Sequence, residues 1–219
     1  ARHADTKVGD PQFKAGILNG LGVIDFDGGD LIRQSSDAKS MYNDAAQFSM
    51  FGVGRYSGSD SERIFASADN WNWLFGPNGQ KANRIGHLNG WVHPIDNSYA
   101  DDNNDWHIWQ VTIDNQDRAN AWFDATQVSS QHRGAHDTSY RPKLMQFSGW
   151  DGKRNNNRER SQCQIAEFIA INRVVPETER LKIEGYLAQK WGLTGTLPNA
   201  HSYKVAKPLF GGNQVLTFQ

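Results

Sequence analysis

The segment from Trp106 to Ile113 carries apolar side chains on both of its alternating faces. Trp106 and Ile108 fall on one face, and Trp109, Val111 and Ile113 fall on the other. Successive residues of a strand point to opposite sides of a sheet, so a strand of this kind must be covered on both faces. The sequence therefore predicts a central strand in a domain built from two packed sheets.

Further strand-like runs, each bounded by turn residues, fill most of the remaining chain. They cover residues 22–26, 31–33, 47–56, 62–67, 71–75, 83–92, 119–124, 143–148 and 162–172. The run 31–33 is expected to pair back on 22–26 across the turn Asp27–Asp30. This pattern predicts an all-β sandwich without internal repeats.

Residues 176–191 are the exception and predict one helix near the C-terminus. Pro176 suits the first helical position, and the glutamates that follow favour the positive end of the helix dipole. Ile183, Leu187 and Trp191 recur at helical spacing and form one apolar stripe. Gly192 is a good helix terminator. We expect the stripe to dock the helix at the edge of the sandwich, and the tail from residue 194 to wrap over the surface.

Composition excludes several classes of protein. The chain has 219 residues, which suits one all-β domain, and its 23 basic residues nearly balance 24 acidic ones. That balance argues against a nucleic-acid partner, which usually requires a strong basic bias. No segment approaches the length of about 18 apolar residues that membrane insertion requires. The single cysteine, Cys163, excludes an internal disulfide and is expected to be buried and inert.

Several segments together resemble a known family. They are Asn19–Gly28, the strand that begins Trp106-His107, the strand Ile165–Arg173, the helix segment Glu179–Leu193, and Leu197-Pro198 with His201–Lys204. These segments resemble the laminin G-like branch of the concanavalin A-like lectin/glucanase superfamily, in the form found in bacterial, marine and phage surface proteins.

The resemblance spans about residues 19–204 and implies a two-sheet antiparallel jelly-roll sandwich with one helix, 176–191. Residues 1–18 would then be an N-terminal lead segment, and 205–219 a C-terminal tail. Relatives often begin with a further strand that carries a tryptophan and an aspartate, and this chain starts after it. Either that strand was removed, or another segment or a neighbouring chain is expected to fill its place. The resemblance implies an extracellular, cell-surface or virion location, but it does not fix a function.

Catalytic patterns are missing from the sequence. The superfamily's glucanases carry two carboxylates as E-x-D-x-x-E on one strand face, and this chain has no such pattern. Glu167 is the only glutamate inside a predicted core strand, and we expect it to pair with an arginine such as Arg63. His132 and His136 are four residues apart, but they lie in a glycine-containing loop that does not favour zinc. The sequence therefore favours a non-catalytic protein over an enzyme.

A calcium site is one alternative that the acidic residues leave open. Asp101, Asp102 and Asp105 lie with two asparagines within five residues, and calcium takes six to eight oxygen ligands from loops of this kind. A weaker candidate set is Asp25, Asp27 and Asp30. Both sets are also ordinary turn formers.

Aromatic residues mixed with amides favour a carbohydrate site. Sugars stack their C–H faces on aromatic rings while amides and charged groups take their hydroxyls. If the strands 71–75 and 83–92 are neighbours, they would line one face or rim with Trp71, Asn72, Asn83, Arg84, His87, Asn89 and Trp91. Other tryptophans, namely Trp73, Trp109, Trp122 and Trp191, are expected in the core. The basic loop 153–160 is a further candidate for acidic polysaccharide.

Three functions follow, in order of preference. The first is a non-catalytic recognition module that binds a glycan or cell-surface polysaccharide, with calcium as its candidate cofactor. The second is a structural or assembly domain that packs on copies of itself or on other virion or surface proteins. The third is a polysaccharide hydrolase or lyase.

Overall fold

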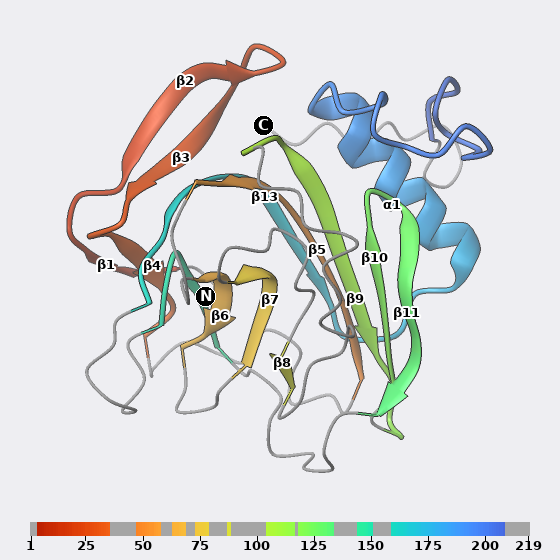
Figure 1. Cartoon of the computed structure of the whole chain (residues 1–219), viewed down its shortest axis with the longest axis horizontal. Coiled ribbons are helices and arrows are strands. Elements are labelled where there is room, and N and C mark those ends of the chain that lie inside the picture. The colour runs from red at the N-terminus through yellow and green to blue at the C-terminus, as the bar shows by residue number, and fades with distance from the viewer. Residues whose placement is uncertain are drawn as a thin grey trace.

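The structure, a computed structural model, describes residues 4–35, 47–57, 63–68, 73–78, 87–88, 104–116, 118–133, 144–150 and 159–208. Within these residues two antiparallel sheets form a sandwich, with one helix outside it (Figure 1). The seven-stranded sheet has the spatial order β11 (Thr126–Arg133), β10 (Arg118–Phe123), β9 (His107–Ile113), β5 (Phe48–Tyr56), β13 (Gln162–Ile171), β3 (Leu21–Asp27) and β2 (Gln12–Leu18). The six-stranded sheet has the order β1 (Thr6–Val8), β4 (Leu31–Arg33), β12 (Met145–Phe147), β6 (Arg63–Ser67), β7 (Trp73–Asn78) and β8 (His87–Leu88). The jelly-roll sandwich expected from the sequence is confirmed.

Strand β9 is central, as its two apolar faces predict. It lies between β5 and β10, and all seven of its residues are buried. Trp109 and Val111 pack with Phe48 and Met50 of β5 between the two sheets. The alternate residues of both strands, such as Ile108, point to the outer face of the seven-stranded sheet.

The pairing expected for residues 31–33 is wrong. These residues form β4, which pairs with β1 and β12 in the six-stranded sheet, and not with β3. The turn before β4 redirects the chain, because the buried Asp30 carboxylate accepts hydrogen bonds from the backbone N–H groups of Asp10 and Asp27. Leu31 then enters the core fully buried, so the chain crosses from one sheet to the other at this point.

The single helix, α1 (Glu177–Lys190), lies on the outer face of the seven-stranded sheet and not at its edge. Its stripe of Ile183, Leu187 and Trp191 packs on Phe51 and Val53 of β5 and on other outer-face residues. Burial of each such side chain stabilises the fold by about 1.5–3 kcal/mol. The outer face of this sheet is apolar here, so it needs a cover that the second sheet cannot provide. In the described part of the chain, no helix has the length and apolar character that crossing a bilayer requires.

Both ends of the helix agree with the sequence. Pro176 is the N-cap residue, one position before the helix that it was expected to start, and its carbonyl accepts the N–H of Arg180 at 2.9 Å. Gly192 adopts a φ of 72°, which lets Leu193 N–H turn back to the carbonyl of Ala188 at 2.7 Å. The chain therefore reverses after the helix and runs back along it.

The segment after the helix is pressed against α1, as expected for a wrapping tail. Leu197 joins the apolar cluster beneath the helix. Tyr203 lies so close to Gly185 that a Cβ at that glycine would come within 2.2 Å of the Tyr203 Cβ. Lys204 donates to the carbonyl of Leu197. Helix and tail together form one cover over the sheet.

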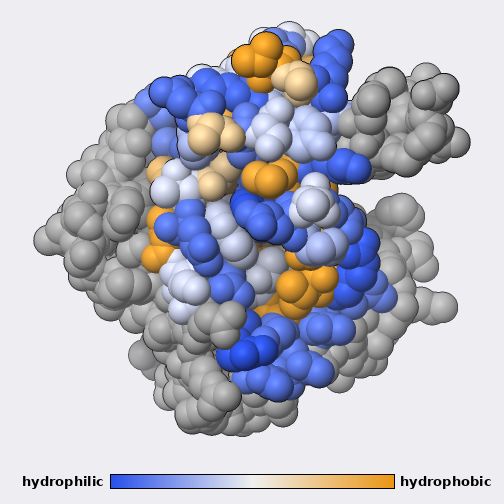
Figure 2. Space-filling view, turned by 90° about the vertical axis from the view of Figure 1, so that its right-hand side faces the viewer, coloured by the Kyte–Doolittle hydropathy of each residue, from blue (hydrophilic) through white to orange (hydrophobic). Residues whose placement is uncertain are grey.

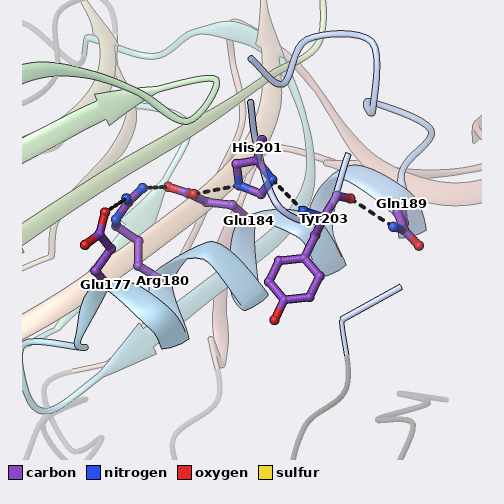
Figure 3. Close-up of polar contacts among 6 residues, drawn as sticks. All are labelled: Glu177, Arg180, Glu184, Gln189, His201 and Tyr203. Carbon is purple, nitrogen blue, oxygen red and sulfur yellow. Dashed lines mark hydrogen bonds and ion pairs between the residues drawn. The ribbon is translucent and has the colours of Figure 1, made fainter. Parts of the chain in front are cut away.

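A buried chain of charged groups holds this cover in place (Figure 3). Glu184 is fully buried, and its carboxylate accepts a hydrogen bond from Arg180 Nη1 at 2.6 Å. Its second oxygen lies 3.1 Å from His201 Nε2. His201 Nδ1 accepts the backbone N–H of Tyr203, so the proton of a neutral ring is on Nε2 and is donated to Glu184. Arg180 also stacks on Trp122 of β10, with its Cζ 4.8 Å from the ring centroid.

Substitution of Glu184 tests how much this network contributes to stability. Glu184→Gln leaves the buried Arg180 with only the exposed Glu177 carboxylate, 3.6 Å away, as a countercharge. It also replaces one of the two oxygens that accept from Arg180 and His201 with an NH2 group, which can only donate. We expect the free energy of unfolding to fall by about 3–5 kcal/mol in denaturant titrations. Glu177→Gln is the matched control, because the Glu177 side chain is 79% exposed and its loss should cost less than about 1 kcal/mol. Equal effects of the two changes would contradict the role given to Glu184.

Candidate functional site

The sequence-predicted glycan rim is assigned to the runs 71–75 and 83–92, within which the structure describes part of β7 and all of β8. These strands are neighbours, with Trp73 paired to Leu88 and Leu74 paired to His87, so the condition on which that hypothesis depended is met. The rim residues Trp71, Asn72, Asn83, Arg84, Asn89 and Trp91 lie outside the described residues, as does the side chain of His87. The rim therefore stays a prediction.

The predicted core tryptophans divide between the two faces of the seven-stranded sheet. Trp73 and Trp109 are fully buried between the sheets, and Trp191 is buried beneath the helix. Trp122 is half-buried on the outer face, where it stacks on Arg180. Cys163 is buried and is a free thiol, as expected.

The predicted metal ligands do not come together in the described residues. Asp101 and Asp102 lie outside them, and Asp105 is exposed just before β9. Asp27 accepts the N–H of Gly29, and Asp30 accepts that of Asp10, so both carboxylates stabilise a turn. Among the described residues no group of three or more histidine, cysteine or acidic side chains could hold a metal ion. His132 has no described side chain, and His136 and residues 153–158 of the basic loop lie outside the described residues.

Glu167 has other partners than the expected Arg63. A register shift between Ile165 and Glu167 in β13 turns the Glu167 side chain to the outer face, beneath the helix. There it accepts hydrogen bonds from Trp191 Nε1 at 2.6 Å and Tyr186 Oη at 3.1 Å, and it forms an ion pair with Lys190 at 3.1 Å.

Arg63 instead forms an ion pair with Glu159 and lies over the Trp150 ring, and desolvation lowers its pKa. Glu167 and Glu159 therefore each pair with a cation, and each of these contacts joins two parts of the fold.

A polar row that the sequence did not predict crosses the outer face of the seven-stranded sheet. It contains Trp106, Arg55, Gln164, Asp25 and Gln12, and we call it the outer-face row. Arg55 is paired with Gln164, Gln164 with Asp25, and Asp25 with Gln12, so four adjacent strands place these residues side by side. Trp106 lies at the start of β9, next to the strand that carries Arg55.

Direct contacts link four members of the row. The Arg55 guanidinium lies over the Trp106 ring, with Cζ 5.4 Å from the centroid. Arg55 Nε donates to Gln164 Oε1 at 2.8 Å, and Gln164 Nε2 donates to Asp25 Oδ1 at 2.6 Å. Each of these four side chains is half-buried, so one edge of each is accessible to solvent.

The position of the row follows from where the helix cover ends. Arg55 is two residues beyond Val53, and Trp106 is two residues before Ile108, so both share the face that α1 covers further along the strands. Adjacent strands are about 4.8 Å apart, which spaces an aromatic ring, a cation, an amide and a carboxylate evenly. Such a row can stack a sugar ring and bond several of its hydroxyls at once.

Comparisons with known proteins give a fold and no family. No family model and no curated protein sequence matches the chain. Among solved structures, the sialidase of Trypanosoma rangeli is similar at 10% identity and a TM-score of 0.54, over 86% of this chain and 32% of the sialidase.

Two binding domains of other proteins match this chain with TM-scores close to that of the sialidase. The binding domain of Paraclostridial Mosquitocidal Protein 1 gives 13% identity and a TM-score of 0.51, over 82% of this chain and 47% of that one. The binding domain of botulinum neurotoxin DC in complex with SialylT gives 14% and 0.50, over 83% and 46%. The chain thus spans about a third to a half of these structures, and what it shares with them is the sandwich fold.

The contacts of Tyr186 predict a loss of stability in base. Burial raises the pKa of Tyr186 above its ordinary 10.0. Burial opposes the charge of Lys190, but hydrogen bonds to Tyr186 and Glu167 outweigh this and raise its pKa above 10.5. The folded state therefore holds these protons more tightly than the unfolded chain, so their stabilisation is complete below pH 10 and declines as pH rises through the folded-state values.

The measurement is denaturant unfolding from neutral to strongly basic pH. Tyr186→Phe should make the decline in base shallower than in the parent protein, because it removes one of the two titrating groups. A profile of the same steepness in the variant would contradict the assignment.

Proposed function

We propose that this protein is a non-catalytic carbohydrate-binding module of an extracellular, cell-surface or virion protein. The observation that carries the proposal is the outer-face row, in which Trp106, Arg55, Gln164 and Asp25 align across adjacent strands. Rigid strands hold these side chains in register, and their interactions leave an accessible edge for a ligand. The laminin G-like assignment belongs to the same proposal.

The fold neighbours support this function by analogy. One is the binding domain of botulinum neurotoxin DC in complex with SialylT, and another is the binding domain of a mosquitocidal protein. Another neighbour is a sialidase, whose ligand is a difluoro-KDN sugar. A shared fold at this identity does not transfer a site, so the proposal depends on the row.

Calcium is proposed as an assisting cofactor of this module. Asp105, the described member of the predicted acidic set, directly precedes Trp106 in the chain. A cation held by Asp101, Asp102 and Asp105 would therefore be anchored one residue from the aromatic end of the row. Calcium prefers carboxylate and amide oxygens of this kind.

Binding to a glycan array, measured with calcium and then with chelator, tests the proposal. Wild type should bind a defined subset of glycans, and Trp106→Ala should weaken that binding at least about tenfold, because a stacking surface worth about 1.4 kcal/mol or more is lost. Weaker binding in chelator would support the calcium proposal.

The matched control is Trp122→Ala, which removes another half-buried tryptophan that stacks on an arginine of the same sheet face. It should leave affinity unchanged in folded protein. Loss of binding in Trp71→Ala or Trp91→Ala, with Trp106→Ala unaffected, would instead place the site at the β7–β8 rim.

An assembly function is the second candidate, and one observation favours it. Figure 1 shows β2 and β3 extending beyond the body of the sandwich, with β2 at the end of the described sheet. Three large apolar side chains of this hairpin are exposed: Phe13 at 68%, Ile17 at 43% and Leu21 at 37%. The side of the molecule shown in Figure 2 has no such group of exposed apolar residues among its coloured atoms, because hydrophilic residues separate its hydrophobic spots. An open edge with apolar side chains favours strand pairing with a second copy.

Light scattering over a range of protein concentrations tests the assembly function. If it holds, the parent protein should form ordered oligomers without any glycan, and Phe13→Lys should dissociate them, because a charge at an edge strand opposes pairing. Val205→Lys is the control, since Val205 is 94% exposed but lies outside the hairpin. A parent protein that stays monomeric at high concentration would exclude this function.

A further inference from the structure

Arg55 differs from four other arginines of the fold in having no described carboxylate partner. Four described arginines form ion pairs with a carboxylate, namely Arg63, Arg118, Arg173 and Arg180. Within the described ranges Arg55 has only a neutral acceptor, Gln164, and the Trp106 ring. A half-buried guanidinium without a countercharge has lost part of its hydration and gained no ion pair in return.

The contacts of Arg55 hold it in place without using all of its donors. A guanidinium has five N–H donors in one plane, and Gln164 accepts only the one on Nε. The two terminal nitrogens carry the other four, and they have the geometry that grips two oxygens of one carboxylate. The Trp106 ring beneath the guanidinium and the Gln164 amide beside it orient that plane.

The nearest acidic groups do not occupy this position. Asp25 is two strands away from Arg55, at about 10 Å by strand spacing, and its described bond is to the Gln164 amide. Asp105 is exposed, and the contacts described for Arg55 are those with Gln164 and Trp106. Arg55 therefore carries the positive charge of the row and Asp25 the negative charge, with Gln164 between them.

We infer that the outer-face row binds an acidic saccharide, with a sugar carboxylate seated on the terminal nitrogens of Arg55. The sugar ring stacks beside Trp106, and hydroxyls of the same ligand reach Gln164 and Asp25. This inference rests on the proposed carbohydrate-binding function and adds the chemical class of the ligand. The same guanidinium would also attract a sulfate ester, which shares the negative charge but has a tetrahedral shape.

The test uses pairs of saccharides that differ only in charge. Pectate, alginate and hyaluronan fragments and sialyllactose are each compared with their methyl esters by titration of the whole chain, and a sulfated, uronate-free carrageenan oligomer is included. Wild type is expected to bind at least one acid about tenfold or more above its ester, which is the usual strength of a charge-assisted hydrogen bond. Arg55→Gln is expected to abolish that difference, and Arg55→Lys to retain part of it, because lysine keeps the charge but not the planar fork.

The controls distinguish failure of the acidic-ligand inference from failure of the proposed carbohydrate-binding function. Arg33→Gln changes another half-buried arginine, on β4 of the other sheet, and is expected to preserve the preference for the acid. Equal binding of acid and ester, or binding of the ester alone, would overturn the inference and leave the carbohydrate function standing. Tighter binding of the carrageenan oligomer would overturn the carboxylate assignment in favour of sulfate. No binding to any saccharide here or on the array would overturn both.

Discussion

The structure depends on a sheet that is apolar on both faces. Strands β5 and β9 bury Phe48 and Trp109 against the six-stranded sheet, and Phe51, Val53 and Ile108 on the opposite side. Two different covers are therefore required, and the chain provides a second sheet on the inside and a helix with its tail on the outside. The helix cover ends before the strands do. Where it ends, the outer face becomes polar, and the outer-face row begins there.

Buried ion pairs decide how rigid the outer cover is. Glu184 joins the helix to the tail through His201, and Arg180 joins the helix to β10 through Trp122. Glu167 fastens the C-terminal end of the helix to β13 through Trp191. Such buried charges stabilise little against an apolar alternative, but they allow only one arrangement of the groups that share them.

The sequence predicted what depends on local periodicity. It identified β5, β9, β13 and the helix with its buried stripe, because alternation and helical spacing are visible in single segments. It missed β1, β2 and β11, which carry few buried residues, and it misplaced β4. The prediction that Glu167 pairs with Arg63 was wrong, because a bulge in β13 shifts the side-chain alternation by one residue. No local sequence pattern reveals such a bulge. The outer-face row was missed for a related reason: its members are far apart in the chain and meet only through strand register.

The most direct test of the central claim is a ¹H–¹⁵N NMR titration with the tightest-binding saccharide. Side-chain N–H signals distinguish the outer-face row from the β7–β8 rim. Trp106, Arg55 and Gln164 carry such groups in the row, and Trp71 and Trp91 carry them in the predicted rim. The account predicts that these three signals shift together and saturate at one affinity, while the indole signal of Trp191, buried beneath the helix, stays in place. Shifts confined to the indoles of Trp71 and Trp91, with the row unchanged, would contradict it and move recognition to the β7–β8 rim.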